Sequence, residues 1–379
     1  MISFIKKFFI KSKWVFAKPQ IKSLLLIDGI FDPLKFYYNE EDYNILYRRG
    51  EEYNFYVIIK CLFEFDLSSK NYIKNYVLFS KPRLIITAIH NYIGFYELSK
   101  LTGVKTMFIQ SAITTEWGDL FGDKIATNKK NKKKFKVDYM LVFNSAYGKK
   151  FKRFIDGKYF VIGSFKNNLS INNTKVLNKK KEVLFISSYK LKEYSTLKVN
   201  NVPTYNFIKN EKKLFFIISK LCKENNLKLN ILGKNAALSD GFFEKKYYEK
   251  IIPNKFKFIK NFYGRKTYKI LNKYKYILTI DSTLAIENLS NGGRSGFLFN
   301  RPFTNVIKSR AFGYYEKIGR KGPFWTSYNY EDEIKRVFEY VIFKSDQRWK
   351  NITKIYINKI MPKDMDNKKF NSIIKNEIN

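Results

Sequence analysis

The residues best placed to do chemistry follow an apolar run in the C-terminal half of the chain. The stretch "YKYILTID" (274–281) predicts a buried strand, and Ser282 and Thr283 follow Asp281 at the start of a short helical pattern. A helix amino terminus carries unpaired N–H groups and about half a positive charge, so it binds phosphate readily. The two hydroxyl groups would add hydrogen bonds there. The pattern predicts a diphosphate site, and the alternative is that Asp281 or Ser282 only caps the helix.

Glu287 is the second group of interest in this stretch. In a capping box the acidic residue comes three positions after the cap, whereas Glu287 follows Ser282 by five positions and Thr283 by four. One turn beyond a phosphate loop, its carboxylate could accept hydrogen bonds from a pair of sugar or ribose hydroxyls. Gly292 and Gly293 would then end the helix.

Several common chemistries are excluded by what the chain lacks. His90 is the single histidine, and Cys61 and Cys222 lie far apart in the sequence, so a His/Cys zinc site is excluded. No G-x-G-x-x-G follows the first strand and no P-loop is present. A D-x-D motif occurs only at 364–366, where no strand precedes it. We therefore expect no metal site and no cofactor.

The elements that would position these residues alternate between apolar and amphipathic patterns. Near-continuous hydrophobic strands separated by helices indicate parallel sheets covered on both faces. A polar stretch rich in Asn and Lys over 164–181 interrupts this rhythm and predicts a linker. The fold class is therefore α/β, with two Rossmann-like parallel sheets and C-terminal helices. The runs that predict strands are 23–28, 83–89, 105–110, 138–144, 158–163, 182–188, 227–233, 256–260, 274–281 and 295–300.

A chain of 379 residues is too long for one ordinary core. We predict an N-terminal α/β domain over 1–164, a C-terminal α/β domain over 165–329 and a helical tail over 330–379.

The formal net charge of +39 attracts anions of many kinds, including acidic membranes and phosphorylated substrates. The same excess of lysine is what an AT-rich genome produces, so the charge alone names no partner, and we expect none that is a nucleic acid. The two distant cysteines fit a reducing compartment. The start of the chain, 1–18, places an apolar arc opposite Lys6, Lys7, Lys11 and Lys13, as in a helix on an anionic membrane surface. The alternative is a basic helix packed on its own domain.

Six motifs in this order resemble those of the surface carbohydrate biosynthesis (putative O-antigen biosynthesis) proteins, and the two domains resemble a GT-B glycosyltransferase. The resemblance spans most of the chain, and it departs from the family pattern at Ser111-Ala112 and at His90. The motifs are "TMFIQSA" (106–112), "VDYMLVFN" (137–144), "VIGSFKNN" (161–168), "DSTLAIENLSNG" (281–292), "GPFWTS" (322–327) and "MDNKKFNSII" (365–374).

The resemblance implies two domains facing a cleft and a cytoplasmic enzyme that transfers a sugar from a nucleotide-sugar to a surface-glycan precursor, a glycan or lipid-linked acceptor. A membrane-surface helix over 1–18 would make the enzyme peripheral on the inner face of the plasma membrane. Ser187, Ser188 and Lys234, each at the end of a predicted strand, are then candidates to bind the donor beside Ser282 and Thr283.

An inverting transfer also needs a base to take the proton of the acceptor hydroxyl. We expect the base in the first domain. His90 ends a predicted strand, and Glu116 and Asp119 lie in the polar loop after "TMFIQSA".

Two other classes of function remain open at this point. One is a glycerol- or ribitol-phosphate transferase, or a sugar-nucleotide epimerase, with the same two domains. The other is a non-catalytic adaptor that binds an acidic membrane or a glycan.

The first prediction concerns metal ions. A metal-free transferase must neutralise the leaving nucleotide diphosphate with helix dipoles and cations. We expect the transfer rate of the purified chain to survive EDTA, with added Mg²⁺ acting only by screening phosphate charge. An absolute requirement for Mn²⁺ or Mg²⁺, restored by that ion alone, would contradict this prediction.

Overall fold

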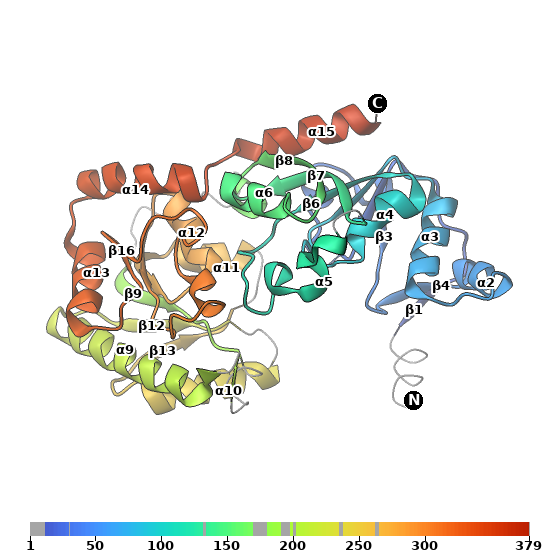
Figure 1. Cartoon of the computed structure of the whole chain (residues 1–379). Coiled ribbons are helices and arrows are strands. Elements are labelled where there is room, and N and C mark those ends of the chain that lie inside the picture. The colour runs from blue at the N-terminus through green and yellow to red at the C-terminus, as the bar shows by residue number, and fades with distance from the viewer. Residues whose placement is uncertain are drawn as a thin grey trace. The chain divides into compact units, whose positions relative to one another are not determined.

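The structure is a computed structural model of the whole chain, shown in Figure 1. It divides into two compact units: unit 1 is Met1–Thr114, Asp123–Phe165 and Asp366–Asn379, and unit 2 is Thr115–Gly122 and Lys166–Met365. Each unit is described by itself. The residues that the structure describes are 12–29, 31–131, 134–169, 180–190, 198–199, 202–234, 238–261 and 265–378.

This division runs close to the predicted boundary, because the sheet of unit 1 ends just before Phe165. Two segments are distributed differently from the prediction. Thr115–Gly122 belongs to unit 2 although unit 1 precedes and follows it in the sequence. The predicted tail over 330–379 is shared, with its residues up to Met365 in unit 2 and the rest in unit 1.

Unit 1 is built on a six-stranded, fully parallel sheet in the order β3-β2-β5-β6-β7-β8. Alternate side chains of β2, β5 and β6 form one buried layer, and Phe370 and Ile374 of α15 pack into it. The strands are β1 Lys13–Val15, β2 Leu24–Ile27, β3 Tyr43–Leu46, β4 Glu52–Asn54, β5 Leu84–Thr87, β6 Lys105–Ile109, β7 Lys136–Val142 and β8 Asp156–Val161. The helices are α2 Phe55–Phe63, α3 Ser69–Ser80, α4 Phe95–Thr102, α5 Lys124–Thr127, α6 Ser145–Phe151 and α15 Lys368–Ile378, and α7 Phe165–Asn168 lies at the junction.

Unit 2 contains a seven-stranded sheet in the order β13-β12-β9-β14-β15-β17-β16, parallel except for β16. Its strands β9, β12, β14 and β15 are almost fully buried where they pass through the core, as expected for a sheet covered on both faces. The strands are β9 Lys180–Ile186, β12 Leu229–Leu232, β13 Lys257–Ile259, β14 Tyr274–Thr279, β15 Arg294–Leu298, β16 Lys321–Gly322 and β17 Trp325–Thr326, with a separate hairpin of β10 Lys198–Val199 and β11 Val202–Pro203. The helices are α9 Thr204–Glu224, α10 Leu238–Ile251, α11 Arg265–Leu271, α12 Thr283–Ser290, α13 Glu331–Phe343 and α14 Asp346–Ile360.

The predicted fold class is confirmed: every apolar run predicted as a strand overlaps a strand of one of the two parallel sheets, and helices end the chain. Most of the predicted linker, 170–179, lies outside the described residues.

The amino-terminal prediction is corrected in part. Residues 1–11 lie outside the described residues, but Lys13–Val15 forms strand β1, which pairs in parallel with β4. A helix therefore does not continue through 13–15, since the backbone there is extended and paired. Within the part of the chain that the structure describes, no helix has the length and apolarity to span a bilayer.

Candidate functional site

The order in which the chain adds strands to the unit 2 sheet reverses between β9 and β14. The chain moves outward from β9 to β12 and β13, and then returns to place β14 and β15 on the other side of β9. In open parallel sheets, ligands bind outside the carboxyl ends of the strands at such a switch point. The loops that leave β9 and β14 carry Ser187-Ser188 and Asp281-Ser282-Thr283, so the predicted donor residues of these two loops lie at the switch point.

A buried acid joins the two loops. The Ser188 Oγ donates a hydrogen bond to Asp281 Oδ1 at 2.6 Å, and Asp281 Oδ2 lies 2.5 Å from the Arg310 Nη2. The side chains of Asp281 and Arg310 are both more than nine-tenths buried. Arg310 closes the 3₁₀ turn Ile307–Arg310, so this contact fixes a third loop at the same edge of the sheet.

Electrostatics keeps Asp281 ionised despite its burial. Burial alone would raise the pKa of Asp281, but Arg310, Arg301, the hydrogen bond from Ser188 and Lys234 together lower it below the ordinary value of an aspartic acid. The carboxylate is therefore charged at neutral pH.

Arg301 forms a second buried ion pair, with Glu211. Its Nη1 lies 2.6 Å from Glu211 Oε1 on α9, and both side chains are 1% exposed. The Tyr247 hydroxyl of α10 donates to the other oxygen of Glu211 at 2.7 Å. Arg301 follows β15, so its guanidinium also lies beyond the carboxyl edge of the sheet.

The segment Thr115–Gly122 packs against Arg310. The guanidinium of Arg310 lies 4.2 Å from the centre of the Trp117 ring, on which Phe207 stacks at 5.7 Å, and the Lys190 Nζ lies 5.5 Å from the same ring centre. The backbone N–H of Glu116 donates to Ser309 Oγ at 3.0 Å. An aromatic face attracts a guanidinium, so Trp117 stabilises Arg310 in addition to its ion pair with Asp281.

Ser282 occupies the N-cap of α12. Its Oγ accepts a hydrogen bond from the N–H of Leu284 at 3.3 Å, and Thr283 is the first helical residue. Both side chains are half-buried. The cap therefore exists, and the N–H of Ala285 donates to the Ser282 carbonyl at 3.2 Å, while the positive end of the helix dipole still favours an anion here. Gly292, with a φ of +78°, follows the end of the helix, as the sequence predicts.

Glu287 is part of α12, and its side chain is buried. Its Oε2 accepts a hydrogen bond from the Tyr268 hydroxyl of α11 at 2.7 Å, and burial together with this carboxylate raises the pKa of Tyr268 well above its ordinary value. Glu287 is 4% exposed, so a sugar hydroxyl would reach it only beside Tyr268.

Ser187 and Lys234 have structural contacts of their own. The Ser187 Oγ accepts from the Tyr248 hydroxyl at 2.8 Å and from the N–H of Tyr189 at 3.1 Å. The backbone N–H of Lys234 donates to the buried Glu244 at 2.8 Å, and its ammonium group acts on Asp281 through charge. The Ser187 hydroxyl therefore stabilises the loop after β9, whereas Lys234 adds positive charge at the site.

His90 lies in unit 1, after β5, and its side chain is buried. Its Nδ1 accepts from the N–H of Ser111 at 3.3 Å, and its Nε2 lies 2.8 Å from the Thr114 hydroxyl. Burial lowers the pKa of His90 to about 4. The ring is therefore neutral at pH 7, and assignment of the proton to Nε2 satisfies both contacts. In this arrangement His90 joins two turns of the loop after β6.

Glu116 and Asp119, the other candidate bases, belong to unit 2 and not to the first domain. Both are half-buried in the segment that carries Trp117, and Asp119 Oδ1 accepts from the N–H of Leu120 at 2.8 Å. The three candidate bases are thus divided between the two units.

Unit 1 has a switch point of its own, between β2 and β5. Asp28 follows β2 there with a φ of +61°, and its carboxylate accepts from the Arg48 Nε and backbone N–H, both at 3.0 Å. The guanidinium of Arg48 stacks on Tyr92 at 3.8 Å. No sequence pattern indicates this pair, because its partners lie twenty residues apart in different loops.

The sequence analysis also missed Arg301 and Arg310. One signal could have pointed to them: only eleven of the 72 basic residues are arginine. Where lysine is the default cation, an arginine marks a place that needs the planar, weakly hydrated guanidinium.

Metal ligands do not gather in the described part of the chain: no three His, Cys, Asp or Glu side chains there could hold an ion together.

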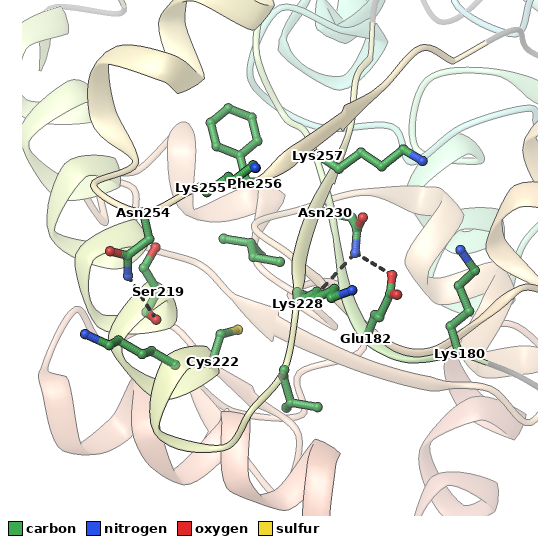
Figure 2. Close-up of a pocket in the computed structure, with 13 residues that line it drawn as sticks. Lys180, Glu182, Ser219, Cys222, Lys228, Asn230, Asn254, Lys255, Phe256 and Lys257 are labelled. Carbon is green, nitrogen blue, oxygen red and sulfur yellow. Dashed lines mark hydrogen bonds between the residues drawn. The ribbon is translucent and has the colours of Figure 1, made fainter.

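A separate cavity of about 720 Å³ lies at the opposite, amino edge of the unit 2 sheet (Figure 2). Figure 2 shows that the ammonium groups of Lys180, Lys228 and Lys257 do not converge on one point. α9 and α10 end at this edge, and basic residues there offset the negative carboxyl ends of helices. The position of these lysines is therefore accounted for by the helix ends, without a bound ligand.

The second prediction tests the buried pair. Arg310→Ala leaves the Asp281 carboxylate buried without its main partner, and breaking such a pair costs about 3–5 kcal/mol of folding stability. In the variant, burial raises the pKa of Asp281 above its unfolded value. The deficit relative to the parent should therefore be largest at neutral pH and shrink as the pH falls through that raised pKa, measured as the difference in melting temperature by calorimetry. Arg310→Ala with Asp281→Asn should recover part of the loss, and a deficit independent of pH would contradict the argument.

Solved structures with the same fold include a putative UDP-N-acetylglucosamine 2-epimerase from Listeria monocytogenes (10% identity, 94% of this chain and 95% of that one, TM-score 0.56). A UDP-GlcNAc 2-epimerase from Neisseria meningitidis, bound to UDP-GlcNAc, matches at 11% identity over 94% and 99% of the chains, with a TM-score of 0.54. The wall teichoic acid polymerase TagF matches at 9% identity over 94% and 89%, with a TM-score of 0.53. At these identities the likeness shows the fold alone, which is GT-B-like.

No curated protein matches the sequence. A family model described as "putative O-antigen biosynthesis protein" matches residues 107–378, which is more than half of the chain. That match includes the loops of Ser188, Asp281 and Arg310. The chain therefore belongs to the putative O-antigen biosynthesis protein family.

Proposed function

We propose that the chain is a metal-independent glycosyltransferase that moves a sugar from a nucleotide-sugar to a surface-glycan precursor, on the cytoplasmic side of the membrane. The observation that carries this proposal is the switch point of unit 2. There the amino end of α12, with Ser282 and Thr283, lies in the same set of loops as two buried guanidinium groups. Family membership supports the glycan pathway, and the fold is one that UDP-GlcNAc enzymes use.

Each group at the switch point has a role in this proposal. The α12 amino terminus and the Ser282 and Thr283 hydroxyls bind the diphosphate of the donor. Arg310, Arg301 and Lys234 stabilise the charge that develops on the leaving nucleotide, because fixed cations in a water-poor site need little reorganisation. Asp281 orients Arg310 and remains ionised. Glu287, held by Tyr268, lies one turn further along for a ribose or sugar hydroxyl.

For the base we favour Glu116 or Asp119 over His90. Both imidazole nitrogens of His90 have contacts, and its lowered pKa makes it a weak base. Asp28 and Arg48, at the switch point of unit 1, are the polar groups we assign to the acceptor.

Two relatives in fold offer alternatives. A sugar-nucleotide epimerase would convert UDP-GlcNAc without any acceptor, and a glycerol- or ribitol-phosphate transferase would take a CDP-linked donor. A non-catalytic adaptor would bind no nucleotide. Thermal-shift measurements with UDP-, GDP-, CDP- and CMP-linked donors identify a phosphate transferase, which a CDP-linked donor stabilises, and an adaptor, which no nucleotide stabilises. An epimerase and a glycosyltransferase can share a UDP-linked sugar, and conversion of UDP-GlcNAc without an acceptor identifies the epimerase.

The third prediction separates a diphosphate site from a mere helix cap. Asp is as good an N-cap as Ser, so Ser282→Asp should keep the melting temperature of the parent. Its negative charge would meet the diphosphate, so nucleotide affinity by calorimetry should fall at least tenfold. Thr283→Ala should weaken binding by about 1–3 kcal/mol, the range for a lost hydrogen bond to a charged group.

The matched control is Ser290→Ala, at the other end of α12, where the Ser290 hydroxyl donates to the carbonyl of Met361 at 3.0 Å. It should leave nucleotide affinity unchanged. If Ser282→Asp binds nucleotide as the parent does, with the fold intact, Ser282 serves only as a cap and the diphosphate site lies elsewhere.

A further inference from the structure

The helix α2 and the residue pair after it expose a concentrated apolar surface on unit 1. Figure 1 shows α2 at the margin of this unit, next to α3 and β4. Phe63 and Phe65 are 78% and 99% exposed, values at which neither ring has a place in the core. We call these side chains the α2 surface: Phe55, Tyr56, Ile59, Leu62, Phe63 and Phe65.

The helix does not need this surface in order to fold. Its N-cap is Asn54, whose Oδ1 accepts from the N–H of Val57 at 3.1 Å. Val57 and Cys61 bury the opposite side of the helix in the unit. A surface helix normally turns polar residues to water, yet the outward residues here are aromatic or aliphatic.

Phe65 adds a conformational cost to its exposure. The N–H of Asp66 donates to the carbonyl of Cys61 at 3.1 Å, and the N–H of Phe65 donates to that of Leu62 at 3.0 Å. These two bonds form a Schellman motif, whose left-handed position is usually glycine. Phe65 occupies it with a φ of +54°, which is unfavourable for a bulky side chain. Glycine at this position would adopt the left-handed backbone without strain and would expose no apolar ring to water. Folding stability therefore does not explain the presence of Phe65.

Lys18 and Lys60 lie beside the α2 surface. The Lys18 Nζ lies 5.9 Å from the centre of the Tyr56 ring and 5.6 Å from that of Phe79. Lys60, on α2 itself, pairs with Glu64 at 3.2 Å. Between residues 55 and 81 the sequence has four lysines against two carboxylates.

We propose that the α2 surface docks the protein on an anionic lipid bilayer. Apolar side chains that project among lysines match a bilayer interface, where rings enter the acyl boundary and ammonium groups meet the headgroups. A second copy of the chain is the other apolar partner to consider. Two copies, each with a formal net charge of +39, would repel each other, whereas an anionic bilayer attracts each copy.

The chain start supports the same partner. β1 pairs in parallel with β4, and the Phe16 and Phe55 rings lie 5.4 Å apart, so the residue that follows β1 lies beside α2, whereas Ser12 lies at the other end of the strand, where its hydroxyl donates to the carbonyl of Gly50. The eleven preceding residues continue the apolar and basic composition in sequence, with Lys6, Lys7 and Lys11 among isoleucines and phenylalanines.

The fourth prediction uses the full chain and needs no substrate, so it stands or falls separately from the proposed transferase activity. Co-sedimentation with vesicles of phosphatidylcholine and phosphatidylglycerol should show binding that exceeds binding to phosphatidylcholine alone and weakens with salt. Phe65→Gly should lower the partition coefficient about tenfold, which corresponds to about 1.4 kcal/mol. Its melting temperature should equal or exceed that of the parent, because glycine relieves the left-handed position. Phe63→Ser should weaken binding similarly.

The matched control is Phe216→Ser on α9 of unit 2, which removes a ring that is 59% exposed. Because Phe216 lies outside the α2 surface, this variant should bind vesicles as the parent does. The proposal is overturned if Phe65→Gly and Phe63→Ser bind like the parent, or if only removal of residues 1–11 abolishes binding. It is also overturned if light scattering shows a dimer that the α2 variants dissociate, since the surface would then belong to a second copy.

Discussion

The candidate site depends on one buried carboxylate remaining ionised. Asp281 has lost most of its hydration, and it keeps its charge because Arg310, Arg301, Lys234 and the Ser188 hydroxyl replace the lost water. Those partners come from the loops after β9, β12 and β15 and from the turn that ends at Arg310. A buried charge that lacks its partners is strongly destabilising. The charge on Asp281 therefore determines where four separate loops can lie, and with them the environment of the α12 amino terminus.

The long buried strands of both sheets could be predicted because a strand buried on both faces must be apolar along its whole length. β1, β3, β4, β16 and β17 could not, since they are only two to four residues long and their sequences carry no comparable signal. The predicted tail shows a different limit. Amphipathic patterns identify α13, α14 and α15 as helices with one buried face, but the same pattern does not say which unit supplies the surface that covers it.

The sequence could predict where the residues of the candidate site lie in the sheet, but not which of their side chains form hydrogen bonds or ion pairs with one another. Polar residues at the ends of strands converge wherever parallel strands end together, so Ser188 and Asp281 could be placed side by side in advance. Arg301 and Glu211 are ninety residues apart, and Tyr268 reaches Glu287 from another helix. Such contacts depend on how helices pack on the sheet. The segment of Trp117 is the extreme case, because its neighbours in sequence belong to unit 1 while its ring packs on Arg310 in unit 2.

Arginine and lysine occupy different places in the structure because their side chains differ in hydration. Among the residues that the structure describes, the buried cations are Arg294, Arg301 and Arg310, and no lysine is buried. An ammonium group is strongly hydrated and resists burial, whereas a guanidinium is weakly hydrated and can pair, stack and donate in a plane. Arg310 does this with Asp281 and Trp117, and Arg294 with Asp346 and Trp349. The net charge of +39 is consequently a property of the lysine-rich surface, which governs association, while the buried arginines govern the internal charge pairs on which the candidate site is built.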